Sequence, residues 1–231
     1  MNGYSLGPDT RTPPPAFETL IDVVGLGAGD HAAVIIEALN AVGGYNIVGL
    51  LDPDISEFRI GKLTLPILGD DRLLVELHNR NIRYFFNGLG SVKSTTSRSE
   101  VFEKACACGL QPISIVHPTA RISPSAQLGR GVIVLVGAYI GPRAKLKDNV
   151  LINTGAIVEH DCELGDHVHV APGAILGGRV KVGPGVHVGM GSRVIQGCSI
   201  GERAIVGAGA VVVQEVKPHE IVVGVPARPI G

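Results

Sequence analysis

The chain has 231 residues, of which 45% are hydrophobic, and its 20 basic and 21 acidic side chains leave a formal net charge of −1 at pH 7. This length predicts one or two domains with an ample core, and the balanced charge argues against a general role on nucleic acids or membrane surfaces. The sequence has neither an apolar run of 18 residues nor a basic leader followed by an apolar segment. We therefore expect a cytoplasmic protein that does not cross a membrane.

Residues 1–17 are rich in Gly, Pro and polar side chains and are predicted to form a disordered leader. Residues 18–115 alternate short apolar runs with helical patterns, which predicts a small Rossmann-like parallel sheet in an α/β domain. The predicted strands are residues 20–24, 47–51, 84–86 and 112–115, and the predicted helices are residues 32–41, 70–77 and 99–108. Asp70 or Asp71 is the expected N-cap of the second helix, and Gly109 is expected to end the third.

A glycine-rich turn joins the first predicted strand to the first predicted helix, with the sequence Gly-Leu-Gly-Ala-Gly-Asp-His at positions 25–31. Such a turn offers backbone N–H groups and a helix N-terminus to an anion, usually a phosphate. Asp30 replaces the third glycine of the dinucleotide fingerprint, and the domain, at about 95 residues, is short for NAD. Asp52 ends the second predicted strand, where a carboxylate can bind ribose or base hydroxyls. A tight turn without a ligand is the alternative that the residues leave open.

From Val116 to Val212, every sixth residue is Ile, Leu or Val, through seventeen positions without a slip in register. A small or compact residue stands four positions after each, and Gly directly follows several of them. A period of six fits neither an amphipathic helix nor a half-buried strand, and it is the signature of a β-helix. The aliphatic side chains should point into a prism, with Gly relaxing φ at the corners. A purely structural solenoid is the alternative, because a repeat array need carry no chemistry.

Histidines are the only obvious chemistry within the repeat. His160 stands two residues after the inward Val158 and should point outward, with Asp161 or Glu159 as the carboxylate that a general base needs beside it. His169 and His187 are 18 residues apart and should stack on one edge. The alternative for an exposed histidine on a solenoid is a solvated side chain. The four cysteines lack the CxxC-type spacing of a zinc site and are expected to be small buried residues.

Three features together resemble the NeuD/PglD-type sugar acetyltransferases of the hexapeptide-repeat superfamily. They are the α/β domain whose turn ends in His31, the hexads that contain Asn-Thr-Gly at 153–155 and Val-Glu-His-Asp at 158–161, and the ending Gly-Val-Pro-Ala-Arg at 224–228. The resemblance implies a nucleotide-sugar-binding α/β domain over residues 18–115. It implies a left-handed parallel β-helix acetyltransferase domain, with coils of 18 residues and a C-terminal tail, over residues 116–231. It also implies a homotrimer with active sites between neighbouring prisms.

Matched position by position, the resemblance implies that His160 is the catalytic base, that Asp161 is the carboxylate beside it, and that no metal takes part. Asp30 stands where the family usually has Gly, and Asp161 stands where it often has Glu. The implied acetyl-CoA contacts are His169, Gly178, Met190 and Ala208, together with Arg228, whose cation in the tail can face a phosphate. The implied acceptor contacts are Gly29, Asp30, His31, Asp52, Pro53, Gly90 and Asn153.

The resemblance therefore implies an acetyl-CoA-dependent N-acetyltransferase acting on a UDP- or GDP-linked amino sugar in bacterial glycan biosynthesis. His160 would take a proton from the amine during direct transfer, and a backbone N–H near Gly178 would stabilise the oxyanion. One alternative is O-acetylation of a sugar of the sialic-acid type. Others are a zinc enzyme resembling γ-carbonic anhydrase, with histidines from facing prisms, and a non-catalytic nucleotide-sugar-binding protein. The sequence does not identify the sugar, the nucleotide base or the acylated position.

Overall fold

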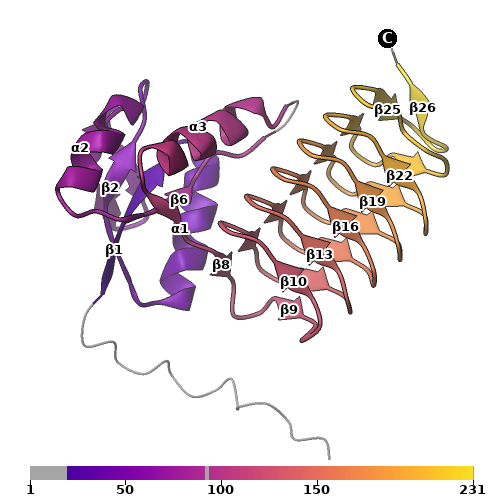
Figure 1. Cartoon of the computed structure of the whole chain (residues 1–231), viewed down its shortest axis with the longest axis horizontal. Coiled ribbons are helices and arrows are strands. Elements are labelled where there is room, and N and C mark those ends of the chain that lie inside the picture. Colours follow the sequence, from indigo (N-terminus) through magenta and orange to yellow (C-terminus); the bar gives the residue numbers. More distant parts are fainter. Residues whose placement is uncertain (1–19, 92–93, 231) are drawn as a thin grey trace, which may run out of the picture.

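The computed structural model describes residues 20–91 and 94–230, which form two domains in chain order (Figure 1). An α/β domain comes first, and a stack of β-helical coils extends away from it, with the C-terminal strand at the far end (Figure 1). The predicted leader, residues 1–17, lies outside the described residues. None of the helices in the described ranges is long and apolar enough to cross a membrane.

The sheet of the α/β domain has five parallel strands in the order β5-β2-β1-β6-β7. These strands are β1 (Ile21–Leu26), β2 (Tyr45–Leu51), β5 (Ile67–Gly69), β6 (Tyr84–Asn87) and β7 (Gln111–Pro112). The helices are α1 (Asp30–Val42), the 3₁₀ turn η1 (Asp71–Leu73), α2 (Leu74–Asn79) and α3 (Thr96–Ala107). A small antiparallel hairpin, β3 (Phe58–Ile60) and β4 (Leu63–Leu65), precedes β5. The sequence predicted the parallel sheet correctly but not β3, β4 or β5.

Two predicted elements of this domain were wrong in detail. The helix predicted over 70–77 begins as the 3₁₀ turn η1, in which the Asp70 carboxylate accepts the Arg72 N–H at 2.9 Å, and becomes α-helical only at Leu74. The strand predicted over 112–115 is two separate strands, because the hydrogen-bond partner changes within it. Ile113 donates to Phe85 of the α/β sheet, whereas Ile115 donates to Val132 of the β-helix. The chain passes from one domain to the other between these two residues.

The β-helix is a triangular prism whose three faces are parallel sheets of very short strands, which confirms the predicted left-handed parallel β-helix. We name the faces after their outward side chains. The histidine face consists of β8 (Ile115–Val116), β11 (Ile133–Val134), β14 (Leu151–Ile152), β17 (His169–Val170), β20 (His187–Val188), β23 (Ile205–Val206), β25 (Ile221–Val223) and the antiparallel β26 (Arg228–Pro229). The apolar face consists of β9 (Arg121–Ile122), β12 (Tyr139–Ile140), β15 (Ile157–Val158), β18 (Ile175–Leu176), β21 (Arg193–Val194) and β24 (Val211–Val212). The charged face consists of β10 (Gln127–Leu128), β13 (Lys145–Leu146), β16 (Glu163–Leu164), β19 (Lys181–Val182) and β22 (Ser199–Ile200).

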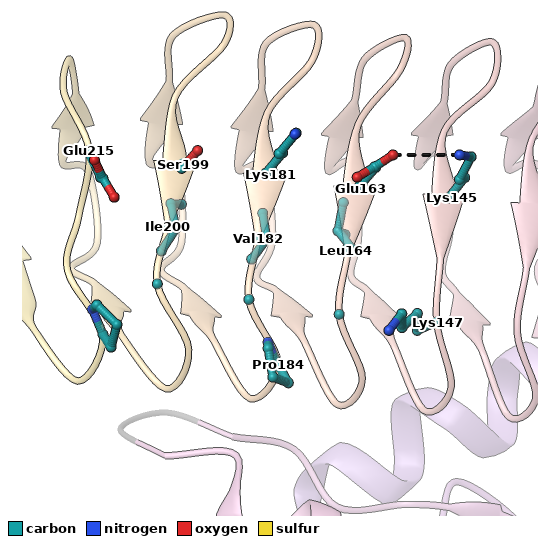
Figure 2. Close-up of a pocket in the computed structure, with 14 residues that line it drawn as sticks. Lys145, Lys147, Glu163, Leu164, Lys181, Val182, Pro184, Ser199, Ile200 and Glu215 are labelled. Carbon is teal, nitrogen blue, oxygen red and sulfur yellow. Dashed lines mark ion pairs between the residues drawn. The ribbon is translucent and has the colours of Figure 1, made fainter.

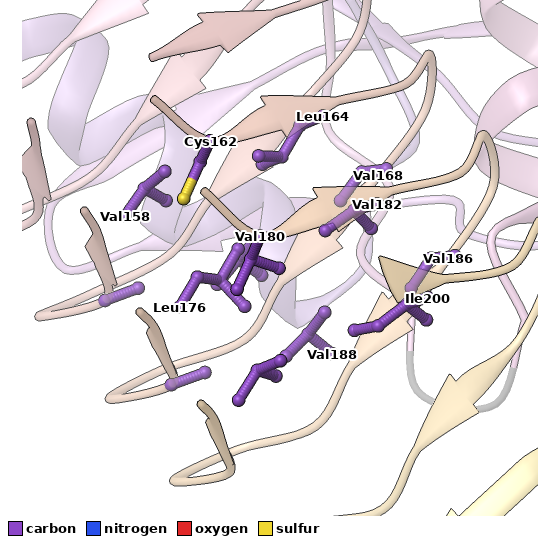
Figure 3. Close-up of a cluster of buried hydrophobic side chains, with 14 of the residues drawn as sticks. Val158, Cys162, Leu164, Val168, Leu176, Val180, Val182, Val186, Val188 and Ile200 are labelled. Atoms are coloured by element: carbon purple, nitrogen blue, oxygen red, sulfur yellow. The ribbon is translucent and has the colours of Figure 1, made fainter. Parts of the chain in front are cut away.

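The core of the prism is the column of aliphatic side chains that the period of six predicted. Strands 18 residues apart pair in register, so that Val158 lies beside Leu176, and Figure 3 shows these two with Val182 and Val188 filling the interior. Cys162 occupies an inward slot, as predicted. The aliphatics of the first coil are only partly buried, because no preceding coil covers them.

The glycines that directly follow the inward aliphatics were predicted to relax φ at the corners of the prism, and for these glycines the prediction was wrong. These glycines do not have positive φ. A Cβ added at Gly141 would lie 2.7 Å from the backbone N of His160, and one at Gly165 would lie 2.6 Å from the N of Pro184. At these two glycines the next coil occupies the space that a side chain would need. The left-handed conformation falls two residues later, for example at Arg143 with φ of 59°.

The two domains share a buried interface. Residues of α1, including Ile35 and Ile36, belong to one apolar cluster with Ile115, Ile133 and Leu151 of the histidine face. A polar network extends this contact. The guanidinium of Arg98 on α3 is only 1% exposed and donates to the carbonyls of Leu89 and Asn149. Burial lowers the pKa of Arg98 to about 9, and the network fixes the loop after β6 against the prism.

Candidate active site

The turn between the apolar and charged faces carries the predicted base. His160 follows β15 and points outward, with its side chain 38% exposed, and its Nδ1 lies 2.8 Å from Oδ2 of Asp161. Arg143, one coil earlier, donates to both oxygens of Asp161 at 2.6 and 2.8 Å. These bonds, first from Arg143 and then from His160, hold the pKa of Asp161 well below its usual range. The charged carboxylate accepts a hydrogen bond from Nδ1–H of His160, which leaves the lone pair on Nε2 free to act as a base.

Gly178 lies one coil after His160 and directly against its ring. A Cβ added at Gly178 would be 2.5 Å from Nε2 of His160. The N–H of Gly178 makes no hydrogen bond to any described residue. Pro142 occupies the equivalent turn position two coils earlier, so the turn folds without a donor there. This N–H is available to a ligand next to the base, as the predicted oxyanion donor requires.

A second set of predicted residues gathers on the histidine face. A cavity of about 420 Å³, which we call the histidine cavity, lies between the start of α1, the loop after β6 and strands β17, β20 and β23. It is lined by the predicted residues His31, Gly90, Asn153, His169, Met190 and Ala208. The residues predicted for the acceptor and those predicted for acetyl-CoA therefore meet in one cavity.

His169 is held by both ring nitrogens. Its Nδ1 lies 2.6 Å from Oγ of Ser91, and its Nε2 lies 3.2 Å from Nδ2 of Asn153. The Thr154 N–H donates to the side-chain oxygen Oδ1 of Asn153 at 2.8 Å, which turns the side-chain NH₂ of Asn153 toward His169. Nε2 thus accepts, and Nδ1 carries the proton and donates to Ser91. Burial, followed by His187, lowers the pKa of His169, so the ring is neutral and joins the loop after β6 to the prism.

His187 and His31 complete the cluster. The ring of His187 is 5.0 Å from that of His169, which confirms the stacking predicted from their spacing, and the ring of His31 is 6.3 Å from His169. Burial lowers the pKa of His187, and burial followed by the charge of Arg98 lowers that of His31 to about 4. Nδ1 of His187 and Nε2 of His31 are buried without a partner in the described ranges.

Asp52 fixes the glycine-rich turn rather than leaving its carboxylate free. Oδ2 accepts the Ala28 N–H at 2.8 Å, and Oδ1 accepts the N–H groups of Asp54 and Ile55 at 3.0 Å. Asp52 and Pro53 line a cavity of about 590 Å³ at the carboxyl ends of β1 and β2, which we call the acidic cavity. Its charged lining residues are Asp52, Asp54, Asp70, Asp71, Glu100 and Lys104.

The remaining predicted residues do not line either cavity. Gly29 is the N-cap of α1 and Asp30 its first residue, and both are exposed. Arg228 lies on β26 and donates to the carbonyl of Ala227 at 2.9 Å. Gly29 and Asp30 thus adjoin His31 at the start of α1, whereas Arg228 lies on the last strand of the prism.

The charged face contributes none of the predicted residues. Its groove of about 570 Å³ is lined by outward side chains of alternating sign, among them Lys145, Glu163 and Lys181 (Figure 2). Lys145 and Glu163 form an ion pair at 3.5 Å. Among the described residues, no group of three or more His, Cys, Asp or Glu side chains could hold a metal ion.

Within one chain, the two halves of the predicted site are separate. His160 lies at the turn between the apolar and charged faces, whereas His169 lies on the histidine face. The base thus belongs to one side of the prism, and the cavity that collects the ligand residues belongs to another.

Comparison with known proteins identifies the family to which the chain belongs. Residues 22–105 match the PglD N-terminal domain, and residues 143–178 and 179–214 match the bacterial transferase hexapeptide of six repeats. PerB from Caulobacter crescentus, solved with CoA and GDP-perosamine, is 37% identical with a TM-score of 0.83, over 91% of this chain and 97% of that one. The chain belongs to the NeuD/PglD-type family of sugar acetyltransferases. No curated protein sequence matches the chain significantly.

Two further structures show the extent of the family likeness. The acetyltransferase domain of PglB from Neisseria gonorrhoeae, in complex with acetyl coenzyme A, is 32% identical with a TM-score of 0.83, over 92% of this chain and all of that one. WeeI from Acinetobacter baumannii is 21% identical with a TM-score of 0.67, and it shares the fold. Both domains of the chain are therefore family domains, in the family order.

Two residues of the site, Arg143 and Ser91, were not predicted from the sequence. Arg143 stands 18 residues before Asp161, one coil earlier, so the repeat length alone could have placed it beside the carboxylate. Ser91 reaches His169 from the loop after β6, across 78 residues of chain, and no spacing in the sequence could have indicated this contact.

Proposed function

We propose that the protein is an acetyl-CoA-dependent N-acetyltransferase whose acceptor is the amino group of a nucleotide-linked amino sugar. The observation that carries this proposal is the outward imidazole of His160, hydrogen-bonded through Nδ1 to the charged Asp161 and packed with Nε2 against Gly178, whose N–H makes no hydrogen bond to a described residue. The relatives support it, because PerB was solved with CoA and GDP-perosamine and the PglB domain with acetyl coenzyme A.

The chemistry of the transfer follows from these atoms. The acceptor nitrogen attacks the thioester carbonyl while Nε2 of His160 takes a proton from it, and Asp161 stabilises the imidazolium that forms. The N–H of Gly178 donates a hydrogen bond to the carbonyl oxygen and stabilises the negative charge that develops there. Such a donor lowers the activation free energy by about 2.7–4 kcal/mol in other acyl transfers. The C–S bond then breaks as the amide forms, and the imidazolium returns the proton to the CoA thiolate.

We further propose that the active site is shared between copies of the chain in a homotrimer. The first support is the separation of His160 from the histidine cavity within one chain. The second is the apolar face, where Tyr139, Ile157 and Ile175 present side chains outward from three successive coils and Val211 does so after the coil of Arg193. A neighbouring prism packed on this face would bring its histidine cavity toward His160.

The turn between the histidine and apolar faces gives a third support. Five successive coils have Gly there with φ of 64–67°, although an added Cβ would meet nothing within 4 Å. These glycines are Gly137, Gly155, Gly173, Gly191 and Gly209. At the other turns the same conformation is adopted by Arg143, Asn149 and His167, so the backbone angle alone does not require glycine. A neighbouring molecule that approaches this edge closely would explain why side chains are absent from it.

The acceptor would bind mainly to the α/β domain. Carboxylates line the acidic cavity, and they accept hydrogen bonds from ribose hydroxyls or base N–H groups but repel phosphate. The diphosphate would then lie over the N-terminus of α1, between this cavity and the histidine cavity. We place the reaction in the cytoplasm, where acetyl-CoA and nucleotide sugars are available.

The decisive experiment is a screen of UDP- and GDP-linked amino sugars with acetyl-CoA, in which release of the CoA thiol is followed. At least one amino sugar should release thiol with the parent and not with His160→Ala. The matching sugar with a hydroxyl in place of the amine is the control, and equal rates on both would contradict N-acetylation. Light scattering should show a trimer, and a monomer at micromolar concentration would contradict the shared site.

A further inference from the structure

The described lining of the histidine cavity is uncharged. It contains no Asp, Glu, Lys or Arg side chain among residues 20–91 and 94–230, and its histidines are neutral near pH 7 because burial lowers their pKa values. Much of its wall is aliphatic, including Pro172, Met190, Ile205 and Val206. The cavity therefore favours the uncharged part of a ligand and disfavours a phosphate or a carboxylate.

Two histidines on this wall, His31 and His187, make no side-chain hydrogen bond to a described residue, and His187 is the one that lies among the aliphatic side chains of the prism. His187 is 6% exposed, and its Nδ1 is buried without a partner in the described part of the chain. Nε2 of His187 is not among the fully buried atoms that lack a partner, and it makes no hydrogen bond to a described residue. A neutral imidazole carries one proton, and a buried unpaired N–H is rarer than an unpaired acceptor, so the proton belongs on Nε2. His187 thus offers an N–H donor to the histidine cavity, whereas both nitrogens of His169 are occupied.

We propose that His187 is a positioning residue for acyl-CoA, whose Nε2–H donates to an amide carbonyl of the pantetheine arm lying in the histidine cavity. This inference rests on the proposed function. The arm is uncharged and alternates aliphatic segments with amides, so it matches an aliphatic wall on which His187 offers a donor. The nucleotide end of CoA, with its phosphates, would lie outside this cavity.

The test compares two variants of the full-length chain by calorimetric titration with CoA. His187→Phe keeps an aromatic ring against His169 and removes the donor, whereas His187→Gln keeps an amide N–H near the position of Nε2. The Phe variant should bind CoA about three- to tenfold more weakly, the usual effect of one neutral hydrogen bond. The Gln variant should stay within about twofold of the parent. His117→Phe, which changes a histidine on the first coil, is the control and should bind CoA as the parent does.

A second ligand separates this role from a structural one. Adenosine 3′,5′-bisphosphate lacks the pantetheine arm, so it should bind equally to the parent and to both variants. Equal CoA affinity of His187→Phe and the parent would overturn the inference, as would a parallel loss of both ligands. A raised acceptor KM with unchanged CoA affinity would assign the cavity to the sugar and overturn it too. A parent that binds no CoA would instead refute the proposed function.

Discussion

Gly178→Ala tests the geometry of the base more sharply than removal of the base itself. The new methyl carbon would lie 2.5 Å from Nε2 of His160, whereas an ordinary contact begins at 3.4 Å. The tip of the imidazole must therefore move by about 0.9 Å. The backbone at Gly178 does not have positive φ, so alanine itself fits the local conformation.

The displaced ring should cost activity and leave the fold intact. The move distorts the 2.8 Å hydrogen bond between His160 and Asp161 and shifts Nε2 from its position against Gly178. A misplacement of about 1 Å can lower kcat by roughly 10²-fold. Stability should change little, because Gly-to-Ala replacement stabilises by about 0.4–1 kcal/mol through the unfolded state and an off-rotamer side chain costs about 0.5–1.5 kcal/mol.

Gly177→Ala is the matched control. Its Cβ would meet the backbone N of Gln196 at 2.7 Å, and a backbone in the next coil cannot turn aside as a side chain can. We expect it to lower the free energy of unfolding by about 1–3 kcal/mol, as overpacking does. The assays are kcat at saturating substrates and urea unfolding of both variants. Retention of kcat within threefold by Gly178→Ala would refute the reasoning, as would a loss of stability equal to that of Gly177→Ala.

Four further predictions concern the base, the core of the prism, the glycine-rich turn and the buried His31. His160→Ala should lower kcat by roughly 10²–10⁴-fold while CoA binding persists by titration, and a kcat within threefold of the parent would exclude a general base. Val170→Asp should abolish cooperative thermal unfolding, because it places an unpaired carboxylate in the core of the prism, and parental melting would contradict the inward register. Asp52→Ala releases the Ala28 N–H and should raise the acceptor KM with CoA affinity unchanged, so an unchanged acceptor KM would move the nucleotide site elsewhere. The pKa of His31 falls from 6.5 to about 4 on folding, so stability is lost as pH drops from 6.5 toward 4. His31→Asn should therefore reduce the loss in unfolding free energy between pH 7 and pH 5 by about 2 kcal/mol, and an equal loss in parent and variant would show that His31 does not titrate abnormally.

The sequence predicted the β-helix almost completely, because its period depends on a local rule. Each hexad builds one strand and one turn, and an aliphatic residue at every sixth position can be buried only in a prism. The outward position of His160 follows from its place two residues after the inward Val158, and the proximity of His169 and His187 follows from their separation of 18 residues, one coil. The α/β domain was predicted less fully, since the segment that contains β3, β4 and β5 has strands of only three residues, too short for a periodic signal.

The sequence by itself determined the register of the prism and the base beside its carboxylate, because residues one or eighteen positions apart are neighbours by construction. Only the tertiary structure decided how the α/β domain meets the prism. The hydrogen bonds between His169 and Ser91 and between Arg98 and Asn149 join residues far apart in the chain, and they depend on how the α/β domain packs against the prism. The tertiary structure also showed what surrounds the glycines that follow the inward aliphatics, such as Gly141 and Gly165. The next coil lies where their side chains would be, and this contact exists only when the coils are stacked.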